Sequence, residues 1–266
     1  MITNRTYGMD ADVIAYNARI VAGGNQSLSM QSLRQLNQFV ISIKKMGLWH
    51  NIVCWPLRAN QNADAGSIAY SLGGLGIYNG TISNNPTRQP NGLYFESARS
   101  QLINTTFGSN IGINNFGIFC CADFSETQLA SNGYGIVVAN RDIFGSGAAK
   151  GMAIGTTSTT NARLQLGNGT TNFTQNTTKT SSFTCYSQLS NGSNTIQSEN
   201  NRILASNAPV ISGPFIGSDI QIGVQLSNQN FFQGRISFIM GVFGITNNSS
   251  IYSLYKTTLG QDLGLP

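Results

Sequence analysis

The feature that most constrains the fold is a series of short apolar or alternating segments, each bounded by residues typical of tight turns. From about residue 93 these segments recur between Asn, Gly and Ser clusters: GLYFES, FGIFCCADF, GYGIVVANR, GMAIGT, ARLQLGN, SFTCYSQLSNG, DIQIGVQL and GRISFIMGVFGI. Short runs of this kind, with polar turns and no helical blocks between them, are typical of sandwiches and jelly rolls. We therefore predict a mainly β fold with two antiparallel sheets, a sandwich or a jelly roll.

Particular segments refine this prediction. FGIFCCADF at 116–124 is apolar on both faces, which indicates a strand covered on each side. Ser-Asn-Gly at 190–192 fits a tight hairpin turn. Near the end, NNSSIYSLYKTTL indicates a short helix that Ser249 or Ser250 can cap.

A short helical pair is expected before the sandwich. Residues 10–22 begin with acidic side chains and end at Gly23-Gly24, and Ser29 precedes a second helical segment, about 30–46. Apolar residues of the second segment fall three or four apart on one stripe: Met30, Leu33, Leu36, Val40 and Ile43. This stripe packs either on the body of the chain or its sister helix, or docks the chain onto another subunit.

Trp49 and Trp55 follow in the segment LWHNIVCWP. Two Trp residues so close together form either a sugar-stacking platform or, as we favour, a seal between an appendage and a core. The candidate subunit-docking residues are thus Leu33, Leu36, Val40, Ile43, Trp49 and Trp55. The expected organisation is a helical docking segment at 1–56, a loop-rich connector at 57–92 and the sandwich at 93–266.

Composition excludes several classes of function. Asn occurs 30 times, against 15 Lys and Arg and 10 Asp and Glu, so amides and hydroxyls cover the expected surface. The net charge is +5, but Lys44-Lys45 is the only basic cluster, so we expect no nucleic-acid partner. No apolar run of about 18 residues is present, so we expect no membrane partner.

The cysteine and histidine pattern argues against a metal site or cofactor. The sequence has no CxxC or Cys/His spacing, and His50 is its only histidine. Asp142 and Asp219 are isolated acids in turns, a poor set for calcium. The cysteines are expected to be reduced and mostly buried, as after folding in a cytoplasm: Cys54, Cys120, Cys121 and Cys185.

The region from about 93 to 262 resembles a concanavalin A-like jelly roll of the laminin-G kind. The resemblance is carried, in the family's order, by GLYFESARSQLIN at 92–104, FGIFCCADF at 116–124, SFTCYSQLSNGSNTI at 182–196 and IQIGVQLSNQNFFQGRISFIMGVFGITNNSSIYSLYKTTL at 220–259. The helical pair, LWHNIVCWPL and a following jelly roll together resemble virion proteins of tailed bacteriophages. That resemblance implies a tail-fibre, receptor-binding or capsid-decoration subunit, assembled in the host cytoplasm with other virion proteins as a homo-oligomer.

Some concanavalin A-like proteins are glycoside hydrolases with the pattern Glu-x-Asp-x-x-Glu on one strand. Asp123 and Glu126 match its second half, but Cys121 stands where the nucleophilic Glu is needed. We therefore expect no enzyme and no catalytic residues. The alternative to a structural role is a carbohydrate-binding receptor module whose partners are host cell-surface glycans. Its candidate contacts are Tyr134, Tyr186 and Phe231.

Overall fold

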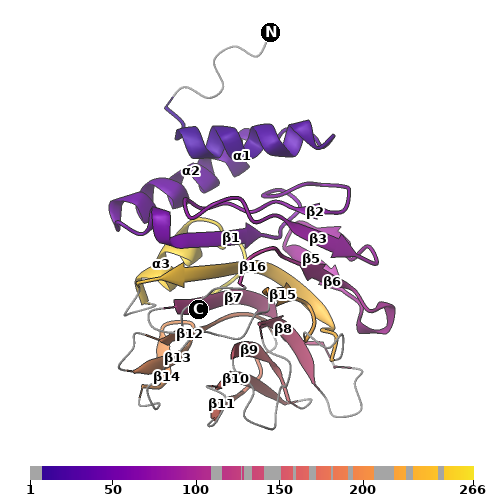
Figure 1. The fold of residues 1–266 in the computed structure, drawn as a ribbon, viewed down its shortest axis with the longest axis vertical. Coiled ribbons are helices and arrows are strands. Elements are labelled where there is room, and N and C mark those ends of the chain that lie inside the picture. Colours follow the sequence, from indigo (N-terminus) through magenta and orange to yellow (C-terminus); the bar gives the residue numbers. More distant parts are fainter. Residues whose placement is uncertain are drawn as a thin grey trace.

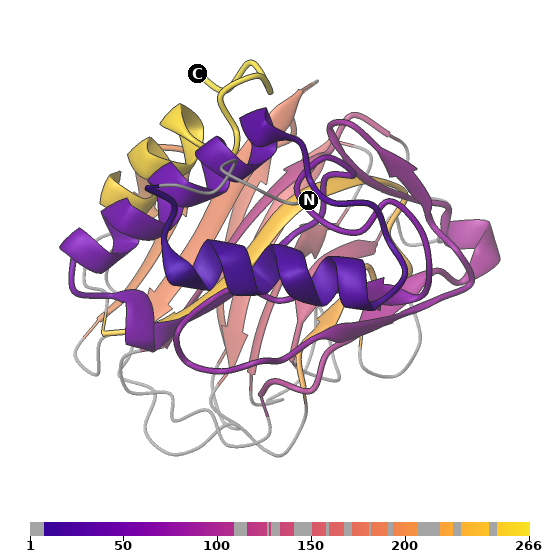
Figure 2. The ribbon, with the colours of Figure 1, turned by 90° about the horizontal axis from the view of Figure 1, so that it is seen from above.

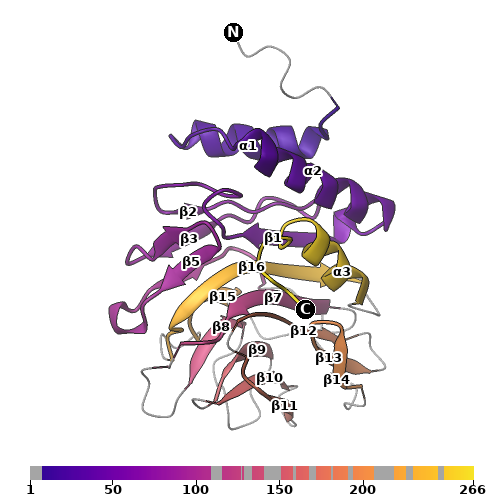
Figure 3. The ribbon, with the colours of Figure 1, turned by 180° about the vertical axis from the view of Figure 1, so that it is seen from behind.

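The computed structural model describes residues 8–108, 116–126, 128, 134–140, 151–157, 160–167, 172–180, 182–190, 194–206, 219–225, 230–244 and 249–266. Within them the chain forms three layers, a layer of helices above two stacked antiparallel sheets (Figure 1, and from behind in Figure 3). The prediction of a mainly β, two-sheet antiparallel jelly-roll sandwich with N-terminal helices is confirmed.

The upper sheet lies between the helices and the second sheet. Its strand order is β14 (Arg202–Ala205), β13 (Thr195–Glu199), β12 (Phe183–Ser190), β7 (Phe116–Asp123), β16 (Gly234–Phe243), β5 (Gly92–Phe95) and β4 (Thr87–Gln89). A further strand, β1 (Ile52–Pro56), pairs with β16 beyond the end of β5, so the two share one edge of that long strand.

The lower sheet has the order β11 (Asn172–Thr178), β10 (Asn161–Gly167), β9 (Gly151–Thr156), β8 (Gly135–Ala139), β15 (Gln221–Ile222), β6 (Leu102–Asn104), β3 (Gly80–Ser83) and β2 (Ile68–Ala69). Neighbouring named strands in both sheets pair antiparallel. β11 and β14 are the last described strands at the same end of the two sheets, where they approach each other.

Strand β7 shows how the sequence specifies the layers. Its residues are all buried, because alternate side chains enter different cores. Phe116, Ile118 and Cys120 join the core between the sheets, whereas Phe119 and Cys121 join the core beneath the helices. The prediction that this strand is covered on both faces is confirmed, and Cys120 and Cys121 point to opposite faces.

The helical layer covers the outer face of the upper sheet (Figure 2). It consists of α1 (Ala11–Ala22), α2 (Met30–Lys45) and α3 (Ser249–Thr257), with short 3₁₀ turns at Trp49–Asn51 and Ser97–Arg99 elsewhere in the chain. Asp10 caps α1 by accepting from the Asp12 backbone N–H, and Ser29 caps α2 by accepting from that of Ser32. The three expected helices are confirmed, with the first two starting or ending one residue from the predicted limits.

The expected division of the chain does not coincide with structural boundaries. β1 comes from the proposed docking segment, and β2, β3 and β4 come from the proposed connector, yet all four strands belong to the two sheets. The helices and the residues before position 93 are therefore part of the sandwich and not an appendage joined by a linker.

A buried arginine fastens this early region to the C-terminal turn. Arg58 is 2% exposed, and its guanidinium donates to both carboxylate oxygens of Asp262, at 2.7 and 2.6 Å. It also donates to the carbonyls of Leu259 and Pro90, each at 2.7 Å. The guanidinium holds the pKa of Asp262 below its usual value, although partial burial opposes this.

The core between the sheets changes character along the sandwich. One half holds packed rings, for example Trp55, Phe107 and Phe116. In the other half, fully buried Gln188 of β12 donates to the carbonyls of Ala153 and Gln165 on the lower sheet, at 2.9 and 3.2 Å. Gln197 of β13 donates to the Leu164 carbonyl at 3.2 Å and to the Gln188 side-chain carbonyl at 2.7 Å.

The four cysteines are free and buried, as expected from their spacing. Burial raises the pKa of Cys54 and of Cys120, which keeps both thiols protonated. Among the described helices, none is long and apolar enough to cross a membrane.

Candidate functional site

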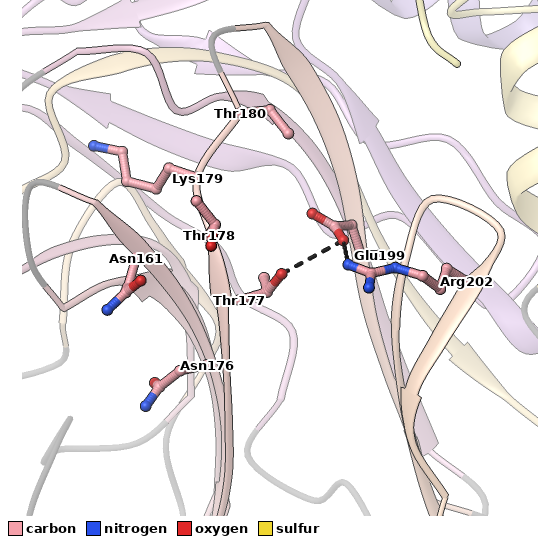
Figure 4. Close-up of a pocket in the computed structure, with 8 residues that line it drawn as sticks. All are labelled: Asn161, Asn176, Thr177, Thr178, Lys179, Thr180, Glu199 and Arg202. Atoms are coloured by element: carbon pink, nitrogen blue, oxygen red, sulfur yellow. Dashed lines mark hydrogen bonds and ion pairs between the residues drawn. The ribbon is translucent and has the colours of Figure 1, made fainter.

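A groove of about 540 Å³ opens between the edge strands of the two sheets (Figure 4). One wall is β11 and the start of β10, and the other is the hairpin of β13 and β14. Its lining is Asn161, Asn176, Thr177, Thr178, Lys179, Thr180, Glu199 and Arg202. Amides and hydroxyls thus dominate, with two cationic side chains and one carboxylate among them.

Local sequence explains both walls. β11 alternates in exposure and is rich in Thr, a residue that fits a half-buried strand. On the other wall, Asn200 and Asn201 form a two-residue turn, and Asn200 has a positive φ of 51°. Such a turn places Glu199 and Arg202 directly opposite each other in the ladder, and their side chains form an ion pair.

Glu199 is the buried charge of the groove. Its side chain is 8% exposed, and besides Arg202 it accepts from the hydroxyl of Tyr186 at 3.3 Å and from that of Thr177 at 3.5 Å. Burial, and then the charge of Glu199, raise the pKa of Tyr186 well above its ordinary value. The tyrosine therefore remains a hydrogen-bond donor that helps to hold the carboxylate in place.

A second, smaller groove of about 400 Å³ adjoins the first. It is lined by Glu199, Asn200, Asn201, Arg202, Tyr252 and Pro266, so it shares Glu199 and Arg202 with its neighbour. Arg202 separates the two grooves, and its side chain is 67% exposed. An elongated polar ligand could therefore follow the hairpin from β11 toward α3 with Arg202 beside its middle.

The structure corrects one of the three predicted glycan contacts. Tyr186 is fully buried between the sheets against Phe124, with ring centroids 5.0 Å apart, so its ring offers no face to a sugar. Tyr134 and Phe231 are half-buried near the same end of β8, where Phe231 bridges to Ile136. The structure thus brings Tyr134 and Phe231 close to the same end of β8, whereas Tyr186 lies in the core.

The predicted subunit-docking set is also wrong as a docking surface. Leu33, Leu36, Val40, Ile43, Trp49 and Trp55 are all buried in the chain's own cores. The α2 stripe covers the outer face of the upper sheet, which would otherwise expose apolar residues of β7 and β16. The stripe therefore packs on the body of the chain, and Trp49 and Trp55 are buried in its two cores and not at a junction with an appendage.

The acidic pair weighed for hydrolysis occupies a strand end. Asp123 pairs with Arg235 at 3.1 Å and accepts from the Ser125 backbone N–H at 3.0 Å. The Glu126 carbonyl accepts from the side chains of Lys179 and Gln128. In the portion of the chain that the structure describes, no three His, Cys, Asp or Glu side chains gather to hold a metal, and Asp142 lies outside it.

Sequence reasoning missed Glu199, Arg202, Lys179 and Thr177. The signal for the first two was present, because Glu-Asn-Asn-Arg is a two-residue turn between residues of opposite charge. Nothing local signals the other two as partners, since the groove forms only when two separate hairpins meet at one end of the sandwich.

No family model and no curated protein matches the sequence. Similar folds occur among solved structures, including Trypanosoma rangeli sialidase, with a TM-score of 0.55, 12% identity, and coverage of 86% of this chain and 40% of that chain. The binding domain of botulinum neurotoxin serotype D matches with a TM-score of 0.53, 11% identity, and coverage of 80% and 52%. The chain thus spans about half or less of each matched chain, and the likeness concerns the fold.

Proposed function

We propose that this protein is a non-enzymatic carbohydrate-binding module that takes sugars in the groove between β11 and the β13–β14 hairpin. The observation that carries the proposal is the lining of that groove by amide and hydroxyl side chains at one end of a sandwich. Such groups supply both the donors and the acceptors that sugar hydroxyls need. The similar folds of a sialidase and of a toxin binding domain support it.

A glycan array followed by calorimetric titration of any hit tests this proposal. Replacing Asn176 by Ala and Thr177 by Val should weaken binding about tenfold, because each change removes a hydrogen-bonding group from the groove. Asn60→Ala, which changes an exposed amide away from the groove, is the control and should bind normally. An array without hits would refute the function, and full binding by the groove variants would refute the site.

The non-enzymatic part of the proposal has its own test. Each bound glycan is incubated with the protein, and the release of new reducing ends is measured. No release is expected, since Glu199 is held by Arg202, Tyr186 and Thr177. Cleavage that disappears in Glu199→Gln or Asp123→Asn would show the protein to be an enzyme.

We propose a second function, that of a structural subunit of a tailed-phage virion assembled in the host cytoplasm. Its supporting observation is the outer face of α1, where Ile14 and Val21 are 40% and 45% exposed and lie seven residues apart on one side of the helix. Exposed apolar residues on a covering layer suit contact with another virion protein or a second copy. Mass spectrometry of purified particles tests this, and absence of the chain from them would end the idea.

A further inference from the structure

The charges that line the groove are not balanced. Glu199 and Arg202 pair with each other, whereas Lys179 has no acidic partner within ion-pair distance among the residues described. Its ammonium donates one hydrogen bond, to the carbonyl of Glu126 at 3.0 Å. Because an ammonium carries three donors, two remain for an acceptor that approaches Lys179.

Lys179 is also held partly out of water. Burial lowers the pKa of its ammonium, and the charge of Asp123 offsets part of that effect. Asp123 is itself committed to Arg235, at 3.1 Å. A cation in a partly desolvated position attracts an anion more strongly than one in bulk water, because the local dielectric is lower.

The position of the side chain separates it from the acid in the groove. Figure 4 shows Lys179 extending away from Glu199, on the side of β11 toward Asn161. An anion bound at the ammonium would therefore avoid the carboxylate. Thr178 and Thr180 flank Lys179 in the chain and also line the groove, so the groove offers hydroxyls as well as a cation.

We infer that the groove selects acidic glycans, and that Lys179 binds their carboxylate or sulfate group while the neighbouring Thr and Asn side chains bind their hydroxyls. The inference rests on the proposed carbohydrate-binding function and adds the class of sugar. A neutral sugar would leave the two remaining donors of the ammonium without a charged acceptor. An anion supplies a charge-assisted hydrogen bond, which is stronger than a neutral one.

The first experiment compares three sets of immobilised glycans: neutral, carboxylated and sulfated. Binding to one or both acidic sets and not to the neutral set is the expected result, and the two acidic sets tell which anion is preferred. Equal or better binding to neutral glycans would overturn the inference and leave the proposed function intact. Absence of binding to all three sets would overturn both.

The second experiment tests Lys179 itself, by titrating the preferred acidic glycan. Lys179→Met should weaken binding about tenfold or more, because it keeps much of the aliphatic stem and removes the charge. Lys179→Arg should largely restore binding. Lys45→Met, the same change at an exposed position on the end of α2, should bind as the unmodified protein does.

Ionic strength gives a result that does not depend on whether a variant folds. Affinity of the unmodified protein for the acidic glycan should fall several-fold between low and high salt, because added ions screen the contact. Affinity that is independent of salt, or unchanged binding by folded Lys179→Met, would overturn the role of Lys179.

Discussion

The two halves of the space between the sheets are filled in different ways. The half beneath β1 is closed by rings such as Trp55 and Phe107, whereas the half near β12 and β13 combines the rings of Tyr186 and Phe124 with the amides of Gln188 and Gln197, which bridge the sheets. The half beneath β1 is sealed by residues from the first part of the chain, and the half near β12 and β13 ends at the groove. The proposed binding groove thus lies away from the end of the sandwich that Trp55 and Phe107 close.

The largest loss of stability should come from removing a ring from the half beneath β1. Trp55→Ala is expected to lower the free energy of unfolding by about 4 kcal/mol, because it empties a large buried volume and leaves the carbonyl of Tyr78 without the indole donor. Urea unfolding followed by circular dichroism measures the loss. Ile203→Ala, at a position 60% exposed on β14, should cost less than about 0.5 kcal/mol. Similar costs for the two variants would show that burial of the Trp55 ring does not cause the loss of stability.

The next largest loss of stability should come from breaking the Arg58–Asp262 ion pair, which joins the early region to the C-terminal turn. Asp262→Asn leaves the buried guanidinium of Arg58 without its carboxylate and should cost about 2 kcal/mol at neutral pH. Because the pKa of Asp262 is lower in the folded state, its stabilisation is present above the unfolded value and lost as pH falls through the folded one. The unfolding midpoints of the two proteins, measured from pH 7 down to pH 2, should therefore begin to converge below about pH 4 and meet only below the folded pKa of Asp262.

Asp64→Asn is the matched control for this titration, because Asp64 is exposed. It should follow the unmodified protein closely across the same pH range. A difference between Asp262→Asn and the unmodified protein that persists at the lowest pH would show that the carboxylate charge is not its source.

In the half near β12 and β13, the stability losses from replacing Gln188 and Gln197 should not be additive. Gln188→Leu is expected to cost about 1.5 kcal/mol, since Gln197 and two carbonyls each lose a buried partner. Adding Gln197→Leu should cost less than the sum of the single changes, because both members of the pair are then apolar. Simple additivity in equilibrium unfolding would argue that the two amides do not act as a unit.

The smallest loss of stability should come from Tyr186, which holds Glu199 beside the groove. Tyr186→Phe removes one hydroxyl donor from Glu199 and is expected to cost about 1 kcal/mol. Tyr78→Phe, whose ring belongs to the half beneath β1, should change stability by less than about 0.5 kcal/mol. Thermal unfolding measures the stability of both variants. A larger loss of stability from Tyr78→Phe would show that the Tyr186 hydroxyl does not stabilise the fold through Glu199.

Periodicity in the sequence was enough for the helices, for the fold class and for most strands after residue 92, but not for β1 to β4, β11 or β14. The two-faced pattern of residues 116–124 predicted a strand buried on both sides, and the spacing of Leu33, Leu36, Val40 and Ile43 predicted the face of α2. The role of residues 52–56 was not predictable in this way. β1 pairs with β16, whose residues lie far away in the sequence, and no local pattern encodes that partner.

The site was predicted less well, for a similar reason. Exposure of a single aromatic residue depends on which strands become edges, and the sequence of β12 does not distinguish Tyr186 from a surface residue. The groove takes its lining from β10, β11 and the β13–β14 hairpin, so its composition is fixed only after those hairpins are placed together. The expectation of a surface clad in amides and hydroxyls did anticipate the chemistry of that lining.

The long strand β16 has a consequence for how the protein is made. On a ribosome, Ile52 of β1 emerges well before Val242, its partner in the ladder. Until then, the apolar faces of α2 and β1 have no sheet to cover, and non-local pairing of this kind slows folding and prolongs exposure to aggregation. Yield in a heterologous host should therefore depend more on chaperone supply and growth temperature than on the intrinsic stability of the finished sandwich.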